Sequence, residues 1–334
     1  MPSTADIADI VREETEKIND GHVRTLSTEL LSQWLENTTP ESFCKDVIYL
    51  RIRELEGNTR RNARLLLGRI KNRIADEAAR VAIMEARHRP SVKKMSKEIL
   101  DAYNLIERLG RGIVYFGSSK TEPGETYYEL TKQLGREIYL LLGSTSWSGA
   151  GPGQMEAALK GAKEAGGKIG GIKILLDKNT SQKEENPSPI LPPECIASCN
   201  YFGPRKIGLV DAGVRMTKED KSAYIFLPGG YGTLDEYGEM LCLQQLTKIG
   251  SSEPVPVILV NYDSLVESGG YYDHLLQFLS SCTQKGAIGK DKRALSPDDL
   301  TLFRVCRTNR EVLDFLADWY EIPEEKRGYE KRIT

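Results

Sequence analysis

The sequence predicts an α/β protein in which a doubly wound parallel sheet follows an all-helical N-terminal region. Residues 1–109 contain almost no glycine and have the pattern of successive helices, whereas from residue 111 short apolar runs alternate with helical segments. Such alternation is typical of parallel strands joined by crossover helices. Two glycine-rich turns, each directly before a helix, fit the loops at the carboxyl edge of such a sheet. We therefore expect a helical region over 1–109, an α/β domain over 110–322 and a charged tail over 323–334.

Three helices are predicted in the N-terminal region. The first spans about Pro40–Arg51, with Thr39 as its N-cap and a proline at the first helical position, where a missing N–H costs nothing. The second spans about Asn58–Arg89 and is ended by Pro90, and the third covers Ser91–Arg108. The second is rich in arginine, but it has an apolar stripe and no interleaved aromatics. We interpret it as a solvated helix that forms part of an interface, rather than as a nucleic-acid-binding helix.

The α/β domain is predicted from apolar runs that alternate with amphipathic segments. The expected strands are Ile113–Phe116, Ile138–Leu142, Gly170–Leu175, Ala223–Leu227, Val255–Val260 and Phe303–Val305. The expected helices are Tyr127–Arg136, Gln154–Ala165, Arg205–Val214, Leu234–Leu246, Tyr272–Ser280 and Arg310–Tyr320. A loop rich in Asn, Ser and Pro follows the third strand, over Asp177–Pro193. In a doubly wound sheet ligands bind outside the carboxyl ends of the strands, so the loops at that edge are the candidate site.

The segment Pro228–Glu236, PGGYGTLDE, carries the strongest chemical signal in the chain. It joins a buried strand to a helix, and its glycines let the backbone turn and let a ligand approach without meeting a Cβ atom. The free N–H groups at the start of the helix favour an anion, so a phosphate is the expected occupant. A purely structural alternative is that Thr233 and Glu236 form a capping box, which needs no ligand. The second glycine turn, Gly149–Gly153, also opens a helix and favours two ends of one nucleotide-like ligand.

Composition excludes several functional classes. The formal net charge of -2 and the pI of about 6.1 give no reason to expect a nucleic-acid partner. The six cysteines are scattered, and their one near pair, Cys195 and Cys199, lacks the further ligands of a zinc site. The chain also has only three histidines, too few for a histidine-rich metal centre, so we expect no bound metal. The N-terminus resembles neither a signal peptide nor a transit peptide, and no segment has the length of a membrane span, so we expect a cytoplasmic protein without a membrane partner.

Four motifs together resemble one protein family. They are Tyr115–Ser119 (YFGSS), Gly149–Ala157 (GAGPGQMEA), Arg205-Lys206 and PGGYGTLDE. They are similar to the motifs of the Lonely Guy family of phosphoribohydrolases, formerly labelled "lysine decarboxylase", over about residues 110–320. The resemblance implies a Rossmann-like fold, homodimers or larger homo-oligomers, and no cofactor. It also implies hydrolysis of the N-glycosidic bond of nucleoside 5′-monophosphates, such as cytokinin riboside monophosphates or AMP, to free base and ribose 5-phosphate.

The resemblance also implies roles for individual residues. Two would be catalytic: the carboxylate of Glu236 meets the ribose and the attacking water, and Arg205 pairs with that carboxylate or with the substrate. The residues that would hold the 5′-phosphate are Gly229, Gly230, Gly232 and Thr233. The residues that would line the rest of the substrate site are Gly117, Ser118, Gly151, Gly153, Glu156 and Lys206.

The chain departs from the family pattern in two places. Ala150 lies where the family commonly has glycine, so a Cβ atom is added there. The interval from Arg205 to Pro228 is also longer than expected. Counting back from PGG would put Gly213 where the functional arginine belongs, with Arg215 nearby. Because the motif that ends in Arg205-Lys206 matches the family better, Arg205 is the preferred candidate.

A second class of function stays open beside the enzyme. Carrier proteins that bind a nucleotide or the molybdenum cofactor without hydrolysis look similar and use a related glycine loop. Such carriers need not retain both Glu236 and Arg205, so this pair favours the enzyme. A pyridoxal-phosphate decarboxylase is disfavoured, because no lysine lies in a recognisable cofactor-anchoring context.

Overall fold

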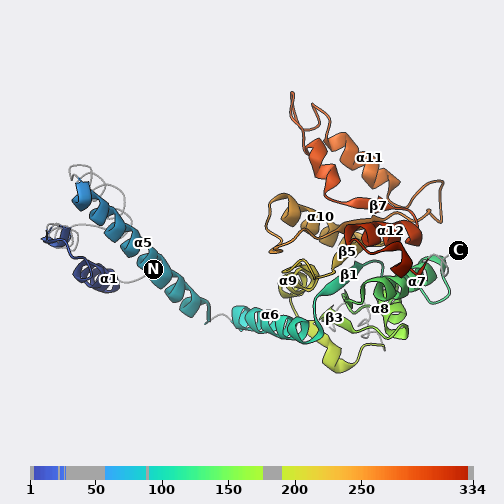
Figure 1. The fold of residues 1–334 in the computed structure, drawn as a ribbon, viewed down its shortest axis with the longest axis horizontal. Coiled ribbons are helices and arrows are strands. Elements are labelled where there is room, and N and C mark those ends of the chain that lie inside the picture. The colour runs from blue at the N-terminus through green and yellow to red at the C-terminus, as the bar shows by residue number, and fades with distance from the viewer. Residues whose placement is uncertain are drawn as a thin grey trace. The chain divides into compact units, whose positions relative to one another are not determined.

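The computed structural model describes residues 4–21, 23–25, 27, 57–87, 90–175 and 190–329 (Figure 1). The chain divides into two compact units, Met1–Lys93 and Lys94–Thr334. The helix predicted over Pro40–Arg51, most of the loop over Asp177–Pro193 and the end of the C-terminal tail lie outside the described residues. The domain boundaries expected from the sequence stay predictions.

In the N-terminal unit, α1 (Thr4–Glu16) packs against α5 (Gly57–Arg87). The apolar side chains of the two helices are buried, with Ala8 and Val11 on α1 and Leu66 and Ile70 on α5. An ion pair adds to this packing, because Arg73 lies 2.7 Å from Glu13 and 3.1 Å from Glu14. The amphipathic pattern predicted for the second helix is therefore satisfied at least in part within this unit.

The second unit is built on seven parallel strands in the order β4-β3-β2-β1-β5-β6-β7. The strands are β1 (Gly112–Phe116), β2 (Thr145–Ser148), β3 (Ile169–Ile174), β4 (Ile196–Cys199), β5 (Ala223–Phe226), β6 (Val257–Val260) and β7 (Arg304–Cys306). The chain runs outward from β1 to β4, then crosses back to β5 and runs outward again. The switch point between β1 and β5 confirms the predicted doubly wound, Rossmann-like sheet.

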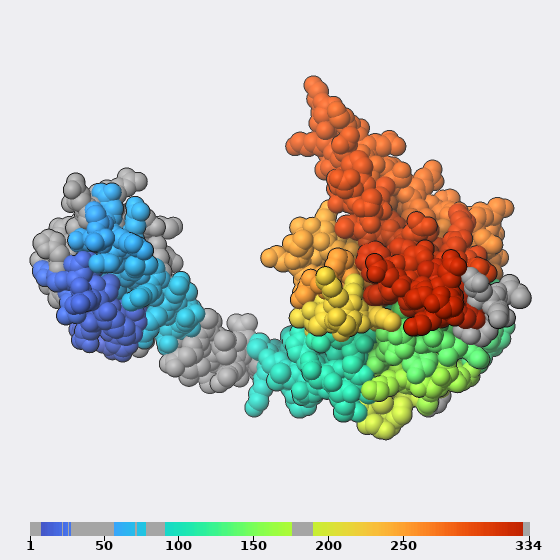
Figure 2. Space-filling view, viewed as in Figure 1, coloured from blue at the N-terminus to red at the C-terminus, as the bar shows by residue number. Residues whose placement is uncertain are grey.

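Helices cover both faces of the sheet, which explains why the central strands β1, β5 and β6 are buried along their whole length. The core on one face contains Ile113, Tyr115 and residues of α7 (Thr126–Leu142), α8 (Gln154–Glu164) and α12 (Asn309–Trp319). The core on the other face contains Val114, Phe116 and residues of α6 (Pro90–Leu109), α9 (Phe202–Gly213) and α10 (Tyr231–Gln245). The remaining long helix, α11 (Asp273–Cys282), has no fully buried residue and, with the segment that follows it, stands out from this unit in Figure 2.

One predicted strand is wrong. Ile138–Leu142 lies in the last turns of α7, and the second strand is Thr145–Ser148 instead. Leu134, Ile138 and Leu142 are four residues apart and face the core together, so their apolar character serves a helix. The strand that replaces them is polar in sequence, yet all four of its residues are buried. No helix in the described part of the chain is both long and apolar enough to cross a membrane.

Candidate active site

The candidate site lies at the carboxyl edge of the sheet, at the switch point between β1 and β5. The loops that follow β2, β1 and β5 lie side by side there, because these strands are neighbours in the sheet. Backbone hydrogen bonds join them: Ser118 N–H donates to Pro228 O at 3.1 Å, and Gln154 N–H donates to Ser118 O at 2.9 Å. The motifs that the sequence places more than 100 residues apart thus form one surface.

Two of the predicted site glycines are needed for this close packing. Gly153 has φ 71°, and a Cβ atom on it would collide with Ser118 O. A Cβ atom on Gly229 would collide with the hydroxyl of Thr233. Glycine therefore lets these loops approach one another, whatever the ligand.

The other two glycines predicted to hold the phosphate, Gly230 and Gly232, have a different environment. Helix α10 begins at Tyr231 with Gly230 as its N-cap, and no side chain caps it. Around the positions where Cβ atoms of Gly230 and Gly232 would lie, there is no atom within 4 Å. Packing between described residues therefore does not require glycine at these two positions, whereas a ligand that approaches the backbone would.

The start of α10 excludes the capping-box interpretation. Thr233 is the third residue of the helix rather than its N-cap, because the helix begins three residues earlier than predicted. The N–H groups of Tyr231, Gly232 and Thr233 have no partner within the helix. Donors of this kind, at the positive end of the helix dipole, form an anion-binding site.

Glu236 and Arg205 form a buried ion pair beside this helix start. Arg205 lies on α9, and its Nη1 donates to Glu236 Oε1 at 2.7 Å. The two side chains are 12% and 8% exposed. Burial raises the pKa of Glu236 above its ordinary value, although the charge of Arg205 opposes this shift. Glu236 lies in the second turn of α10, one turn further than predicted, because the helix begins at Tyr231.

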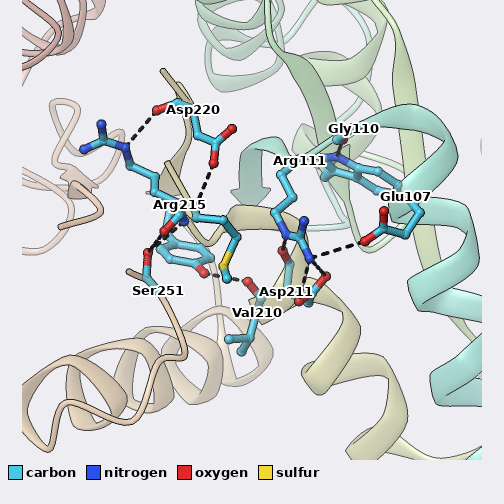
Figure 3. A network of polar contacts seen from close by, with 11 residues as sticks. Glu107, Gly110, Arg111, Val210, Asp211, Arg215, Asp220 and Ser251 are labelled. Atoms are coloured by element: carbon cyan, nitrogen blue, oxygen red, sulfur yellow. Dashed lines mark hydrogen bonds and ion pairs between the residues drawn. The ribbon is translucent and has the colours of Figure 1, made fainter. Parts of the chain in front are cut away.

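Arg215 occupies a separate environment (Figure 3). Its guanidinium donates to three backbone carbonyls, those of Lys218 at 2.9 Å, Asp220 at 2.8 Å and Pro254 at 2.7 Å. The same group lies 5.0 Å from the centre of the Tyr320 ring. Of the two candidate arginines, the structure brings Arg205 to Glu236, and Arg215 holds a neighbouring loop in place.

Comparisons with known proteins agree with this arrangement. The family model described as "Possible lysine decarboxylase" matches residues 155–316. The probable cytokinin riboside 5′-monophosphate phosphoribohydrolase LOGL5 of Oryza sativa subsp. japonica is 28% identical over 190 residues, which are 56% of this chain and 66% of that protein. Cytokinin riboside 5′-monophosphate phosphoribohydrolase LOG5 of Arabidopsis thaliana is 28% identical over 188 residues, 56% of this chain and 71% of that protein. These sequence similarities support the Lonely Guy family for the α/β part of the chain.

Solved structures with a similar chain path include two proteins of molybdenum-cofactor biology. The molybdenum cofactor binding protein from Rippkaea orientalis has a TM-score of 0.38 and 20% identity, over 62% of this chain and 94% of that one. The molybdenum cofactor carrier protein of Chlamydomonas reinhardtii has a TM-score of 0.36 and 17% identity, over 63% of this chain and 98% of that one.

Two further predicted site residues, Lys206 and Glu156, have different partners. Lys206 joins α9 to α10, because its Nζ lies 2.8 Å from Asp235 and 3.3 Å from Glu239. Glu156 instead accepts a hydrogen bond from Tyr128 on α7, on the opposite side of the sheet from α9 and α10. The structure therefore places Lys206 next to the Arg205–Glu236 pair and connects Glu156 to another helix.

The loop after β2 explains the departure at Ala150. This residue has φ 58°, and its Cβ atom packs towards Gly171 of β3 in a small apolar cluster. The preceding glycine, Gly149, is a residue that sequence analysis did not include in the site. A Cβ atom on Gly149 would collide with the guanidinium of Arg205, so this glycine leaves the space in which the arginine lies.

Gln154 is a second site residue that sequence analysis missed. It is fully buried, and its Nε2 donates to Pro228 O at 2.5 Å while its backbone N–H binds Ser118 O. It thus connects the loops of β1, β2 and β5. A signal for this role exists in the sequence, because Gln154 stands directly after the Gly151–Gly153 turn at the start of a helix. If its amide is buried there, it has to form hydrogen bonds with neighbouring loops. Over the described residues, no cluster of three or more His, Cys, Asp or Glu side chains could hold a metal ion.

Proposed function

We propose that this protein hydrolyses the N-glycosidic bond of nucleoside 5′-monophosphates, of the cytokinin riboside monophosphate or AMP type, to free base and ribose 5-phosphate. The observation that carries the proposal is the buried Arg205–Glu236 pair directly beside an uncapped helix start. The relatives named for cytokinin riboside 5′-monophosphate phosphoribohydrolase activity support the same chemistry.

The phosphate would bind at the start of α10. The N–H groups of Tyr231, Gly232 and Thr233 supply donors, and the open space at Gly230 and Gly232 leaves room for phosphate oxygens. Glu236 follows these donors by three to five residues, or about 4.5 to 7.5 Å along the helix axis. Helical side chains lean towards the N-terminus, so its carboxylate would reach the sugar of a ligand whose phosphate occupies the helix start.

Glu236 would then act on the glycosidic bond. Cleavage passes through an oxocarbenium-like state, in which a carboxylate stabilises the positive charge on the sugar and also activates water. The water adds its hydroxyl group to C1′, the bond from C1′ to the base nitrogen breaks, and a proton passes to the base. Arg205 would keep the carboxylate oriented, and its permanent charge favours the ionised form.

The charge at the site favours this enzyme over a carrier that only binds. A buried carboxylate close to a phosphate weakens binding, because two negative groups repel each other in a low-dielectric environment. A carrier gains nothing from this arrangement, whereas glycosidic hydrolysis uses the carboxylate. The pair of Glu236 and Arg205 therefore supports hydrolysis as the function.

The deciding experiment is a panel of nucleoside 5′-monophosphates, cytokinin types included, assayed for free base and ribose 5-phosphate. We expect release from at least one of them, and Glu236→Gln should reduce kcat by about 10²- to 10⁴-fold, as loss of a general base does. Unchanged turnover in a folded Glu236→Gln variant would contradict the assigned role. Binding of nucleotides without release of any base would instead support the carrier.

We further infer, from the family resemblance, a homodimer or larger homo-oligomer and a cytoplasmic location. Light scattering after size-exclusion chromatography tests the assembly, and a monomer that retains full activity would contradict it. The assembly is independent of the chemistry above, because Glu236 and Arg205 meet within one chain.

A further inference from the structure

We propose that Gln154, Tyr271 and Tyr272 are positioning residues of the phosphate loop: Gln154 and Tyr271 hold carbonyls whose following N–H groups then face the ligand, and Tyr272 fixes the carbonyl at which the loop begins. The phosphate loop is defined here as Leu227–Gly230. The proposal rests on the proposed function only in that a phosphate binds at the start of α10, where this loop ends and adds its own N–H groups.

Three successive carbonyls of the phosphate loop each accept a hydrogen bond from a side chain of another segment. The hydroxyl of Tyr272 donates to Leu227 O at 2.6 Å, and that of Tyr271 donates to Gly229 O at 3.1 Å. Between them, Nε2 of Gln154 donates to Pro228 O at 2.5 Å. The donors come from the segment after β6 and from the start of α8, so two distant parts of the chain meet on one short loop.

The planarity of the peptide bond gives these contacts a consequence for ligand binding. In a trans peptide, the carbonyl of one residue and the N–H of the next point in opposite directions. Holding Pro228 O therefore orients the N–H of Gly229, and holding Gly229 O orients the N–H of Gly230. Because glycine rotates easily, these peptides could otherwise turn a carbonyl oxygen towards the phosphate.

The segment that carries the two tyrosines is held by a buried amide, which binds Tyr272 directly. Asn261, directly after β6, is fully buried; its Oδ1 accepts the N–H of Tyr272 at 2.6 Å, and its Nδ2 donates to Asp273 at 2.7 Å. A Cβ atom on Gly270 would collide with this amide, so the chain passes close to it. The ring of Tyr271 is also packed edge-on against Tyr272, with 4.8 Å between ring centres. The donors therefore lie on a segment with a defined conformation.

The test compares three Tyr→Phe variants of the full chain. Tyr271→Phe and Tyr272→Phe each remove a hydroxyl that binds the phosphate loop, while the ring stays. Tyr262→Phe is the matched control, because its buried hydroxyl binds Asn309 at 2.5 Å and makes no contact with the phosphate loop. Calorimetry with ribose 5-phosphate measures binding directly, and a nucleoside without phosphate reports whether the rest of the site is intact.

We expect Tyr271→Phe to raise the Kd for ribose 5-phosphate by about three- to tenfold, the value of one hydrogen bond. The rise should be smaller for Tyr272→Phe, because Leu227 O is followed by Pro228, which has no N–H to orient. Tyr262→Phe should change it by less than about twofold, and binding of the nucleoside should be unchanged in all three. In hydrolysis, KM should rise while kcat stays near its original value.

Equal Kd values for the two variants and the control would overturn the proposal, and so would a wild-type protein that binds neither ribose 5-phosphate nor any nucleoside monophosphate. If the wild type binds ribose 5-phosphate but hydrolyses nothing, the proposed function fails. The weaker binding in Tyr271→Phe would in that case still support the positioning role.

Discussion

At the scale of single residues, the site depends on one buried carboxylate and on the arginine that reaches it. Glu236 is ionised less easily than a glutamate in water, because burial raises its pKa, and Arg205 limits that rise. An ionised Glu236 is needed to activate water, so its environment also sets the acid limit of activity. Two predictions concern this pair.

The first prediction is the pH dependence of activity. The value of kcat/KM should fall as the pH falls through the raised pKa of Glu236, with a midpoint above the ordinary value of 4.5. The pH dependence of stability has the opposite sign to that of activity. The contribution of Glu236 to the free energy of unfolding is present below its unfolded pKa and is lost as the pH rises through its folded pKa. The unfolding free energy of the wild type, relative to Glu236→Gln, should therefore decrease as the pH rises from below 4.5 through the raised pKa of the folded state. A flat difference would contradict the raised pKa.

The second prediction separates the two arginines. Arg205→Ala should lower kcat/KM by about 10²-fold or more, because Glu236 then lacks its cation and is protonated more readily. Arg215→Ala should instead lower the free energy of unfolding by about 2 to 4 kcal/mol, since three backbone carbonyls lose the donor that the buried Arg215 supplies, with kcat/KM near its original value. Steady-state kinetics of both variants measures kcat/KM, and urea unfolding measures the free energy of unfolding. The reverse ranking in kcat/KM would assign the functional role to Arg215.

At the scale of elements, the start of α10 separates glycines that serve packing from glycines that leave room for a ligand. Gly229 lies against Thr233, whereas Gly232 lies in the first turn of the helix with open space around it. The same residue type therefore has two different physical roles within four positions of the chain.

The third prediction uses this difference. Gly229→Ala should destabilise the protein by about 1 to 3 kcal/mol, because the added Cβ atom collides with Thr233. Gly232→Ala should leave stability unchanged or raise it by up to about 1 kcal/mol, since alanine favours a helix more than glycine does. It should nevertheless weaken binding of ribose 5-phosphate, measured by calorimetry. Unchanged binding in Gly232→Ala would place the phosphate elsewhere.

At the scale of the whole molecule, the candidate site belongs to one of the two compact units. The residues that contact one another at the candidate site all lie in the unit Lys94–Thr334. Helix α6 belongs to the core of that unit, because Ala102, Leu105 and Ile106 are buried in the cluster that also contains Val114 and Phe116. A chain cut at residue 110 would lose this part of the core.

The fourth prediction follows from the place of α6. Deletion of residues 1–89 should leave a folded protein that keeps its substrate preference, but with a changed oligomeric state or solubility. Deletion of residues 1–109 should leave an unstable protein, because three buried side chains of α6 are lost at about 1 to 3 kcal/mol each. Chromatography, thermal unfolding and the nucleotide panel test both deletions. A changed substrate preference in the shorter deletion would show that the N-terminal helices reach the site.

The sequence by itself determined the features that depend on neighbours along the chain. Alternating apolar runs and helical segments predicted the doubly wound sheet, and PGGYGTLDE predicted a glycine loop at a helix start, because both are local patterns. Only the tertiary structure decided which arginine meets Glu236, since motif match and spacing favoured different residues. It also decided that a polar segment, Thr145–Ser148, is the buried second strand, and that Gln154 and Tyr271 hold the phosphate loop. Such contacts join residues far apart in the chain, and their geometry depends on the order of strands in the sheet.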